Sequence, residues 1–162
     1  MVRCWISVGS NQNREYCVRG AVRALRGRFG ALMLSSVYES EAVGFDSQPF
    51  LNLVAGIDSG EPVPALLTTL RSIEEAFGRV RGPHRFAPRT LDLDLLTYGG
   101  LAGTVGGCTL PRDEILRDAF VLGPLAEVAA GEWHPILGRT YSELWRAFEK
   151  SAHPLRPVAF VF

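Results

Sequence analysis

The run TLDLDLL at residues 90–96 constrains the fold more than any other part of the chain, because apolar and acidic residues alternate in it. Successive side chains of a strand point to opposite faces, so Leu91, Leu93 and Leu95 share one face and Asp92 and Asp94 share the other. The leucine face predicts packing against a core. Two neighbouring carboxylates repel each other, and a divalent cation between them removes that repulsion. The run therefore predicts either a magnesium site or a half-exposed strand with a solvated outer face.

Strand and helix patterns surround this run without regular β-α-β alternation. Apolar runs bounded by turn residues predict further strands, and apolar residues at helical spacing predict two helices. The expected strands are residues 2–8, which end in a Gly-Ser-Asn turn, 31–40 and 50–59; the expected helices are 14–30 and 61–78.

The C-terminal third is predicted to be mainly helical. Residues 110–129 predict a short turn and helix, then a second helix broken near Gly123 and Pro124. Thr140 and Glu143 have the spacing of a capping box and predict the start of another helix. The weakly alternating tail, PLRPVAFVF, predicts a closing strand. The mixed order of elements predicts an α+β sandwich with a largely antiparallel sheet.

Composition narrows the function classes. A chain of 162 residues, 47% hydrophobic, fits one domain over residues 1–162, and its formal net charge of zero predicts no nucleic-acid or membrane partner. The basic residues are arginines except for Lys150, so a phosphate-binding loop or kinase site that needs an earlier lysine is excluded. Three separated cysteines predict packing roles, and the absence of a leader or spanning segment predicts a cytoplasmic protein.

The segment RVRGPHRFAPR, residues 79–89, is expected to be a loop that carries four arginines next to the acidic strand. Guanidinium groups bind phosphate oxygens through forked hydrogen bonds, and carboxylates bind the magnesium ions that bridge phosphates. A polyphosphate with bound magnesium therefore explains both features. The alternative is a solvated surface loop.

Several blocks, taken in order, resemble the 6-hydroxymethyl-7,8-dihydropterin pyrophosphokinases of folate biosynthesis. These blocks are GSN, SSVYES…VGFDSQPFLN, GRVR…RFAPRTLDLDLL and LP…AFVLGPLAEVA. The resemblance extends to about Ala129, and APRTLDLD differs from the family signature GPRTLDLD only at Ala87. It implies a ferredoxin-like fold that transfers pyrophosphate from ATP to the hydroxymethyl group of the pterin, leaves AMP and uses two Mg²⁺ ions.

The resemblance also implies roles for individual residues. It makes Asp92 and Asp94 the metal ligands, and Arg79 and Arg89 the arginines that grip the triphosphate. The implied nucleotide-binding residues are Arg71, Glu74, Arg81, Arg85, Leu95, Thr109, Arg112 and Arg117, of which Arg81 and Arg85 lie in a loop that closes over ATP. The implied pterin-binding residues are Ser40, Val43, Phe50, Asn52 and Phe120, with the two phenylalanines on either side of the pterin. Without the resemblance, both phenylalanines are expected in the core.

The chain departs from the family pattern mainly on the ATP side. Arg112 stands where a histidine is usual, and Phe86 replaces a loop tryptophan. Asp118 replaces an arginine, and Arg117 lies one position earlier, which rotates its side chain by about 100° around a helix. The tail from residue 151 has no clear family counterpart.

Three hypotheses therefore remain: an active pyrophosphokinase, a pterin-binding paralogue with weakened catalysis, and a pyrophosphokinase for a different heterocycle. A monomer with small-molecule substrates is expected in each case.

Overall fold

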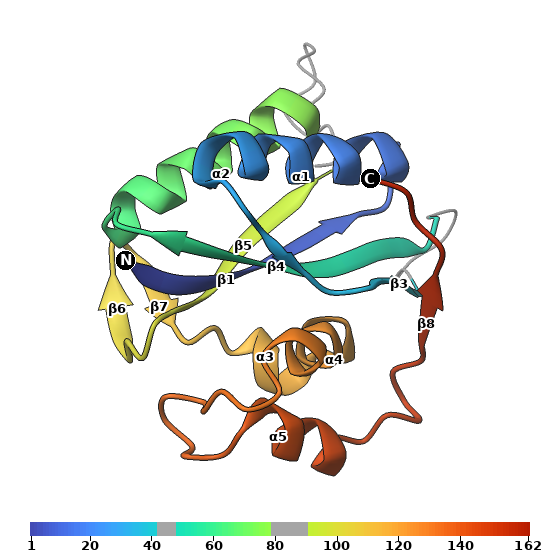
Figure 1. Cartoon of the computed structure of the whole chain (residues 1–162). Coiled ribbons are helices and arrows are strands. Elements are labelled where there is room, and N and C mark those ends of the chain that lie inside the picture. Colours follow the sequence, from blue (N-terminus) through green and yellow to red (C-terminus); the bar gives the residue numbers. More distant parts are fainter. Residues whose placement is uncertain (42–47, 79–90) are drawn as a thin grey trace.

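A computed structural model describes residues 1–41, 48–78 and 91–162, and an antiparallel sheet lies at its centre (Figure 1). The strand order is β5-β1-β4-β3-β8, and β2 also pairs with β4. The strands are β1 (Val2–Ser10), β2 (Met33–Leu34), β3 (Val37–Ser40), β4 (Phe50–Ser59), β5 (Asp92–Tyr98) and β8 (Leu155–Val158).

Helices cover both faces of the sheet. In Figure 1, α1 (Arg14–Phe29) and α2 (Val63–Gly78) lie above it. Below it lie α3 (Glu114–Arg117), α4 (Ala119–Val128) and α5 (Tyr141–Ala147), and a small hairpin of β6 (Gly103–Val105) and β7 (Cys108–Leu110) lies to one side. The predicted α+β sandwich with an antiparallel sheet is confirmed.

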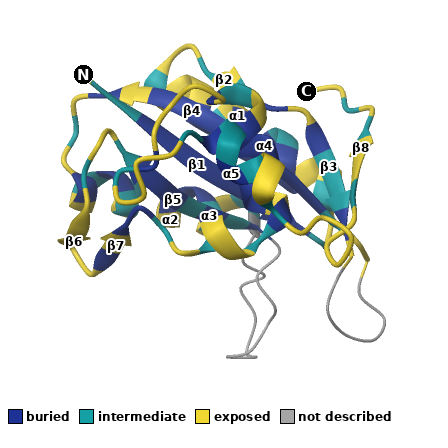
Figure 2. Ribbon diagram, turned by 90° about the horizontal axis from the view of Figure 1, so that it is seen from below, coloured by how far each residue is buried: buried dark blue, intermediate teal, exposed yellow. Residues whose placement is uncertain are grey.

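Each face of the sheet has its own apolar core. Three leucines of the TLDLDLL run, Leu91, Leu93 and Leu95, are at most 4% exposed and belong to the core beneath α1 and α2. Trp5, Val54 and Leu96 belong to the second core, against α4 and α5. Figure 2 shows the central strands buried between these layers. The predicted leucine face of the acidic strand is therefore confirmed, and the two aspartates lie on the α4 side.

The strand expected over residues 31–40 is two strands, β2 and β3, separated by Ser35 and Ser36. The Ser35 hydroxyl accepts a hydrogen bond from the Val54 N–H at 2.9 Å, which replaces a backbone bond of the ladder. The amide and the hydroxyl of Ser36 both donate to the Glu127 carboxylate of α4. Side-chain hydrogen bonds thus interrupt the strand where the apolar pattern predicted continuity.

The expected break at Gly123 and Pro124 is wrong, since both residues lie inside the continuous helix α4. Proline removes one hydrogen bond from a helix. Val121, Leu122 and Leu125 are nevertheless at most 3% exposed, and their burial against the sheet outweighs that loss.

Several smaller expectations can be compared with the structure. β1 continues two residues beyond the expected end, because Gly9 and Ser10 still pair with β4. The cap of α5 is confirmed, since the Thr140 hydroxyl accepts from the Glu143 N–H at 3.2 Å. The closing strand is confirmed as β8. The three cysteines are buried thiols, and burial raises the pKa of Cys4 to about 11. Within the described ranges, no helix combines the length and the apolar character needed to span a membrane.

Candidate functional site

A cavity of about 440 Å³ lies between the sheet and α4. It is lined by residues of four neighbouring strands, of α4 and of the segment before α4. The lining residues are Ser7, Gly9, Ser40, Glu41, Phe50, Asn52, Asp92, Asp94, Leu96, Arg112, Glu114, Asp118, Phe120 and Val121. We call this space the heterocycle pocket, because its walls combine aromatic rings with a few polar groups.

Asn52 and Ser40 form the buried polar part of the heterocycle pocket. The Asn52 amide donates to the Ser40 hydroxyl at 2.8 Å, and the two residues are 3% and 8% exposed. Gly9 faces this pair from β1: a Cβ at position 9 would lie 3.3 Å from the Asn52 Oδ1. The glycine therefore leaves room for a fixed amide that can read the edge of a flat ring.

Phe50 and Phe120 both line the heterocycle pocket and belong to neither apolar core. Phe120 is 37% exposed. The core role expected from composition alone is therefore wrong for both residues. Their position beside a buried amide suits a flat aromatic ligand, since aromatic faces stack on such rings.

The acidic pair lies at the start of β5, next to β1. Asp92 pairs with Gly9 and Asp94 with Ser7, so neither carboxylate meets a bulky side chain from the neighbouring strand. Behind them, the Leu93 amide donates to Glu74 of α2 at 3.0 Å. This bond ties the acidic strand to the helix on the other face of the sheet.

The donor chemistry of the acidic pair fits Mg²⁺. Among the residues that the structure describes, no group of three or more His, Cys, Asp or Glu side chains has the arrangement of a complete metal site. Magnesium is commonly held by one or two carboxylates together with substrate phosphates and water. Two aspartates that line a cavity therefore suit a metal ion that arrives with a polyphosphate.

Among the described residues, Arg112 places a guanidinium group beside the acidic pair. Its Nε donates to Glu114 Oε2 at 2.9 Å, and its Nη2 lies 3.8 Å from Asp94 Oδ1. Its backbone N–H donates to the carbonyl of Leu96 at 2.9 Å, where the β1–β5 register shifts. Backbone and side chain together hold this guanidinium next to the acidic pair.

Two smaller cavities adjoin the heterocycle pocket through shared residues. One, of about 260 Å³, shares Asp94 and Arg112 with it and is also lined by Arg71, Glu74 and Leu95. The other, of about 270 Å³, is lined by Thr109, Arg112 and Glu114 among others. The structure thus brings five of the predicted nucleotide-binding residues together in these two cavities, with Arg112 common to both. The five are Arg71, Glu74, Leu95, Thr109 and Arg112.

Arg117 and Asp118 face different surroundings. Arg117 pairs with Glu114 at 3.3 Å, its side chain is 67% exposed, and it lines none of the three cavities just described. Asp118 lines the heterocycle pocket, and its side chain does not cap α4. Burial raises the pKa of Asp118 above its usual range, and the neighbouring Glu114 adds to the rise. The structure therefore places an acid, rather than an arginine, at this wall.

We expect Asp118→Asn to stabilise the protein at neutral pH and not in acid. The folded protein holds the Asp118 proton more tightly than the unfolded chain does, because burial raises the pKa of this carboxyl group. Bound protons at Asp118 therefore stabilise the fold fully below the unfolded pKa, and this stabilisation is lost as pH rises through the folded pKa. Asparagine stays neutral throughout. Melting temperatures of both proteins should differ at about pH 7 and converge at about pH 3. An equal difference at both pH values would contradict the burial effect.

Five predicted site residues lie outside the described residues: Val43, Arg79, Arg81, Arg85 and Arg89. The two loop departures, Phe86 and Ala87, also lie outside them. Sequence reasoning missed other lining residues. Ser7 and Gly9 carried a signal, because these small residues alternate with the apolar Ile6 and Val8 along β1. Glu114 carried none, since its role arises only when the Arg112 side chain turns back toward it.

Fold and site together define the class: an α+β protein in which an acidic pair and an arginine separate an aromatic pocket from polar cavities. Comparison with known proteins then identifies the family. The sequence profile of the 7,8-dihydro-6-hydroxymethylpterin-pyrophosphokinase (HPPK) family matches residues 5–130. The chain belongs to this family.

Curated relatives agree with this identification. The chain is 38% identical over 110 residues to the 2-amino-4-hydroxy-6-hydroxymethyldihydropteridine pyrophosphokinase of Synechocystis sp., which covers 68% of this chain and 56% of that protein. It is 36% identical to the protein of the same name from Methylorubrum extorquens, over 80% of this chain and 84% of that one. It is also 32% identical to the folic acid synthesis protein fol1 of Pneumocystis carinii. That match covers 95% of this chain but only 21% of the fol1 protein.

Solved structures show the same fold. A crystal structure of HPPK-DHPS in complex with substrates matches with a TM-score of 0.72 at 10% identity, over 93% of this chain and 43% of that one. Wild-type HPPK-DHPS of Plasmodium falciparum matches with a TM-score of 0.68 at 12% identity, over 91% of this chain and 43% of that one. The expected ferredoxin-like α+β fold is confirmed.

Proposed function

We propose that the chain transfers pyrophosphate from ATP to the hydroxymethyl group of 6-hydroxymethyl-7,8-dihydropterin, giving the pterin diphosphate and AMP, a step in folate biosynthesis. One observation carries the proposal: the heterocycle pocket, with Phe50, Phe120 and a buried amide, shares Asp94 and Arg112 with a polar cavity. Family membership supports it, and no observation favours the two alternative hypotheses.

In the proposed reaction, the pterin lies in the heterocycle pocket. Phe50 and Phe120 contact its ring faces, and Asn52, fixed by Ser40, binds its polar edge. The backbone at Val43 and Ser40 contributes further hydrogen bonds in this scheme. The hydroxymethyl oxygen then points toward the acidic pair, where the reacting phosphate must lie.

ATP occupies the adjoining polar cavities. Arg71, Glu74, Leu95 and Thr109 surround the nucleotide, and Arg112 binds a phosphate oxygen at the boundary. By family resemblance, Arg79 and Arg89 grip the triphosphate, and Arg81 and Arg85 close over it. Arg117 belongs to this proposed set only if its side chain leaves Glu114.

The chemistry exchanges one phosphorus–oxygen bond for another. The hydroxymethyl oxygen attacks the β-phosphorus and its proton is released to water. The bond from that phosphorus to the oxygen bridging the α-phosphate breaks, and AMP leaves with that oxygen. Asp92 and Asp94 would hold Mg²⁺, two ions in the family scheme, which neutralises charge on the phosphates. The arginines and the pocket supply alignment of the two substrates. We further propose a cytoplasmic monomer, with residues 1–162 as one domain.

AMP release tests this function. With ATP and Mg²⁺, chromatography should detect AMP when 6-hydroxymethyl-7,8-dihydropterin is added, and none when the acceptor is 6-methyl-7,8-dihydropterin, which lacks the hydroxyl. Pterin binding without AMP would indicate the weakened paralogue. AMP only with another heterocyclic alcohol would indicate a different acceptor.

A further inference from the structure

The C-terminal segment, residues 154–162, lies beyond the residues that match the family profile and runs along the edge of the sheet (Figure 1). It leaves the layer of α5, forms β8 beside β3, and ends near α1 in the opposite layer. We call it the C-terminal strap. It crosses the edge of the sheet at β3, the strand that carries Ser40 of the heterocycle pocket.

On the pocket side, Leu155 contacts both walls. It pairs with Ser40 in the β3–β8 register. Its side chain also packs on α4, since a Cβ at Gly123 would lie 2.9 Å from the Leu155 Cδ1. Phe120 and Val121, on the same helix, line the pocket. Leu155 therefore joins the wall formed by the strands to the wall formed by α4.

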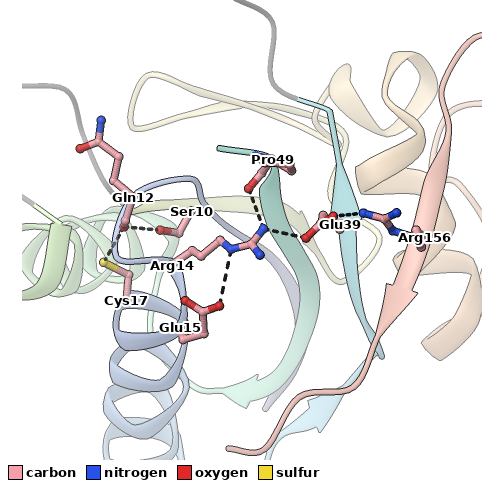
Figure 3. Close-up of polar contacts among 8 residues, drawn as sticks. All are labelled: Ser10, Gln12, Arg14, Glu15, Cys17, Glu39, Pro49 and Arg156. Carbon is pink, nitrogen blue, oxygen red and sulfur yellow. Dashed lines mark hydrogen bonds and ion pairs between the residues drawn. The ribbon is translucent and has the colours of Figure 1, made fainter. Parts of the chain in front are cut away.

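On the opposite face, the next residue of the strap is held by charge. Arg156 forms an ion pair with Glu39, which also accepts from the Arg14 guanidinium at 2.8 Å (Figure 3). Arg14 donates in addition to the Pro49 carbonyl at 3.0 Å, directly before Phe50. Hydrogen bonds from Arg14 and then Arg156 hold the pKa of Glu39 below its usual range, so the carboxylate is charged at neutral pH.

The end of the strap is fastened to α1. The Arg19 Nε donates to the Val161 carbonyl at 2.6 Å, and the Arg19 guanidinium lies 4.8 Å from the centroid of the Phe160 ring. Val158 and Phe160 also pack against the core beneath α1 and α2. The strap is thus attached to both helical layers, and a shift of Leu155 against α4 meets resistance from the other layer.

We propose that the C-terminal strap sets the separation of the two walls of the heterocycle pocket, with Leu155 as the positioning residue. This inference rests on the proposed function of that pocket. Leu155 lines neither the heterocycle pocket nor the two polar cavities, so it acts through Ser40 and α4 rather than by touching substrate. The strap should therefore affect binding of the pterin and leave binding of ATP unchanged.

The test compares Leu155→Ala with Leu137→Ala, a matched truncation at a side chain that is 46% exposed and lines none of these cavities. Leu155→Ala should raise KM for the pterin by about 3- to 30-fold, with KM for ATP and kcat at saturating pterin within about twofold of wild type. Leu137→Ala should match wild type. Leu155→Met keeps the side-chain volume, so its KM for the pterin should stay close to the wild-type value.

Titration calorimetry with the pterin and a non-hydrolysable ATP analogue gives a Kd without turnover and separates the two proposals. Wild-type protein that binds pterin but forms no AMP would contradict the proposed function, and a weaker Kd in Leu155→Ala would still support the strap. Equal pterin Kd and KM in Leu155→Ala and wild type would overturn the strap. Equal loss of pterin and ATP binding would also overturn it, since that result indicates general damage.

Discussion

Replacing Asp94 with asparagine should lower pterin-dependent AMP formation by about 1,000-fold while the fold survives. The carboxylate lies where the heterocycle pocket meets the polar cavity, 3.8 Å from the Arg112 guanidinium. Asparagine keeps the shape and removes the charge that would bind Mg²⁺. The Asp94 side chain is 48% exposed, so the substitution should change stability little. Asp92→Asn should behave in the same way.

Asp58→Asn is the matched control for this prediction. Asp58 belongs to the same sheet but pairs with Arg3 at 2.7 Å and lines none of the three cavities. Its loss should leave kcat/KM unchanged and shift the melting curve little, as is usual for an exposed ion pair. The measurements are kcat/KM at several Mg²⁺ concentrations and a melting curve for each variant. Wild-type rates in Asp94→Asn would remove the metal assignment.

Gly56→Ala should lower the free energy of unfolding by about 2–3 kcal/mol. Gly56 of β4 pairs with Trp5 of β1, and the Trp5 ring crosses directly over it. A Cβ at position 56 would lie 2.4 Å from the Trp5 Cζ3, closer than real Cβ atoms approach. Trp5 is fully buried and its Nε1 donates to Glu132 at 3.0 Å, so the ring has little freedom to move.

Urea denaturation of Gly56→Ala, of Trp5→Phe and of the double variant measures this contact. The smaller phenylalanine ring leaves room for the methyl group, so the double variant should be more stable than the sum of the single effects, by about 0.5–3 kcal/mol. Gly60→Ala is the control, because its Cβ would meet open space, and it should change stability by less than about 0.5 kcal/mol. Additive effects of Gly56→Ala and Trp5→Phe would contradict the steric account.

Local patterns predicted those elements whose packing follows directly from the chain. The alternation in TLDLDLL predicted β5 and its two faces, since period-two spacing determines which side chains meet the core. The Thr140 cap similarly needs only its own neighbours. The predictions of a continuous strand through Ser35 and of a broken α4 were wrong. The hydrogen bond that interrupts the strand comes from Val54, and the residues that α4 packs against also come from distant segments.

The placement of the site residues could likewise be predicted where a sequence motif carried them, and not where distant side chains meet. The resemblance predicted that Phe50 and Phe120 leave the core, which composition alone did not. The link between Arg112 and Glu114 depends on side-chain conformations that no pattern encodes. The strap depends on contacts of Leu155 with Ser40 and Gly123, residues more than thirty positions away in the sequence. Such contacts form only after distant strands have paired into the sheet.

Transfer of label from [γ-³²P]ATP to the pterin tests the central claim most directly. The account predicts that labelled pterin diphosphate and AMP form in equal amounts, and that Asp94→Asn forms neither at a comparable rate. Free labelled pyrophosphate together with AMP would show hydrolysis instead of transfer. Labelled pterin monophosphate together with ADP would show transfer of a single phosphoryl group, and either result would contradict the pyrophosphokinase.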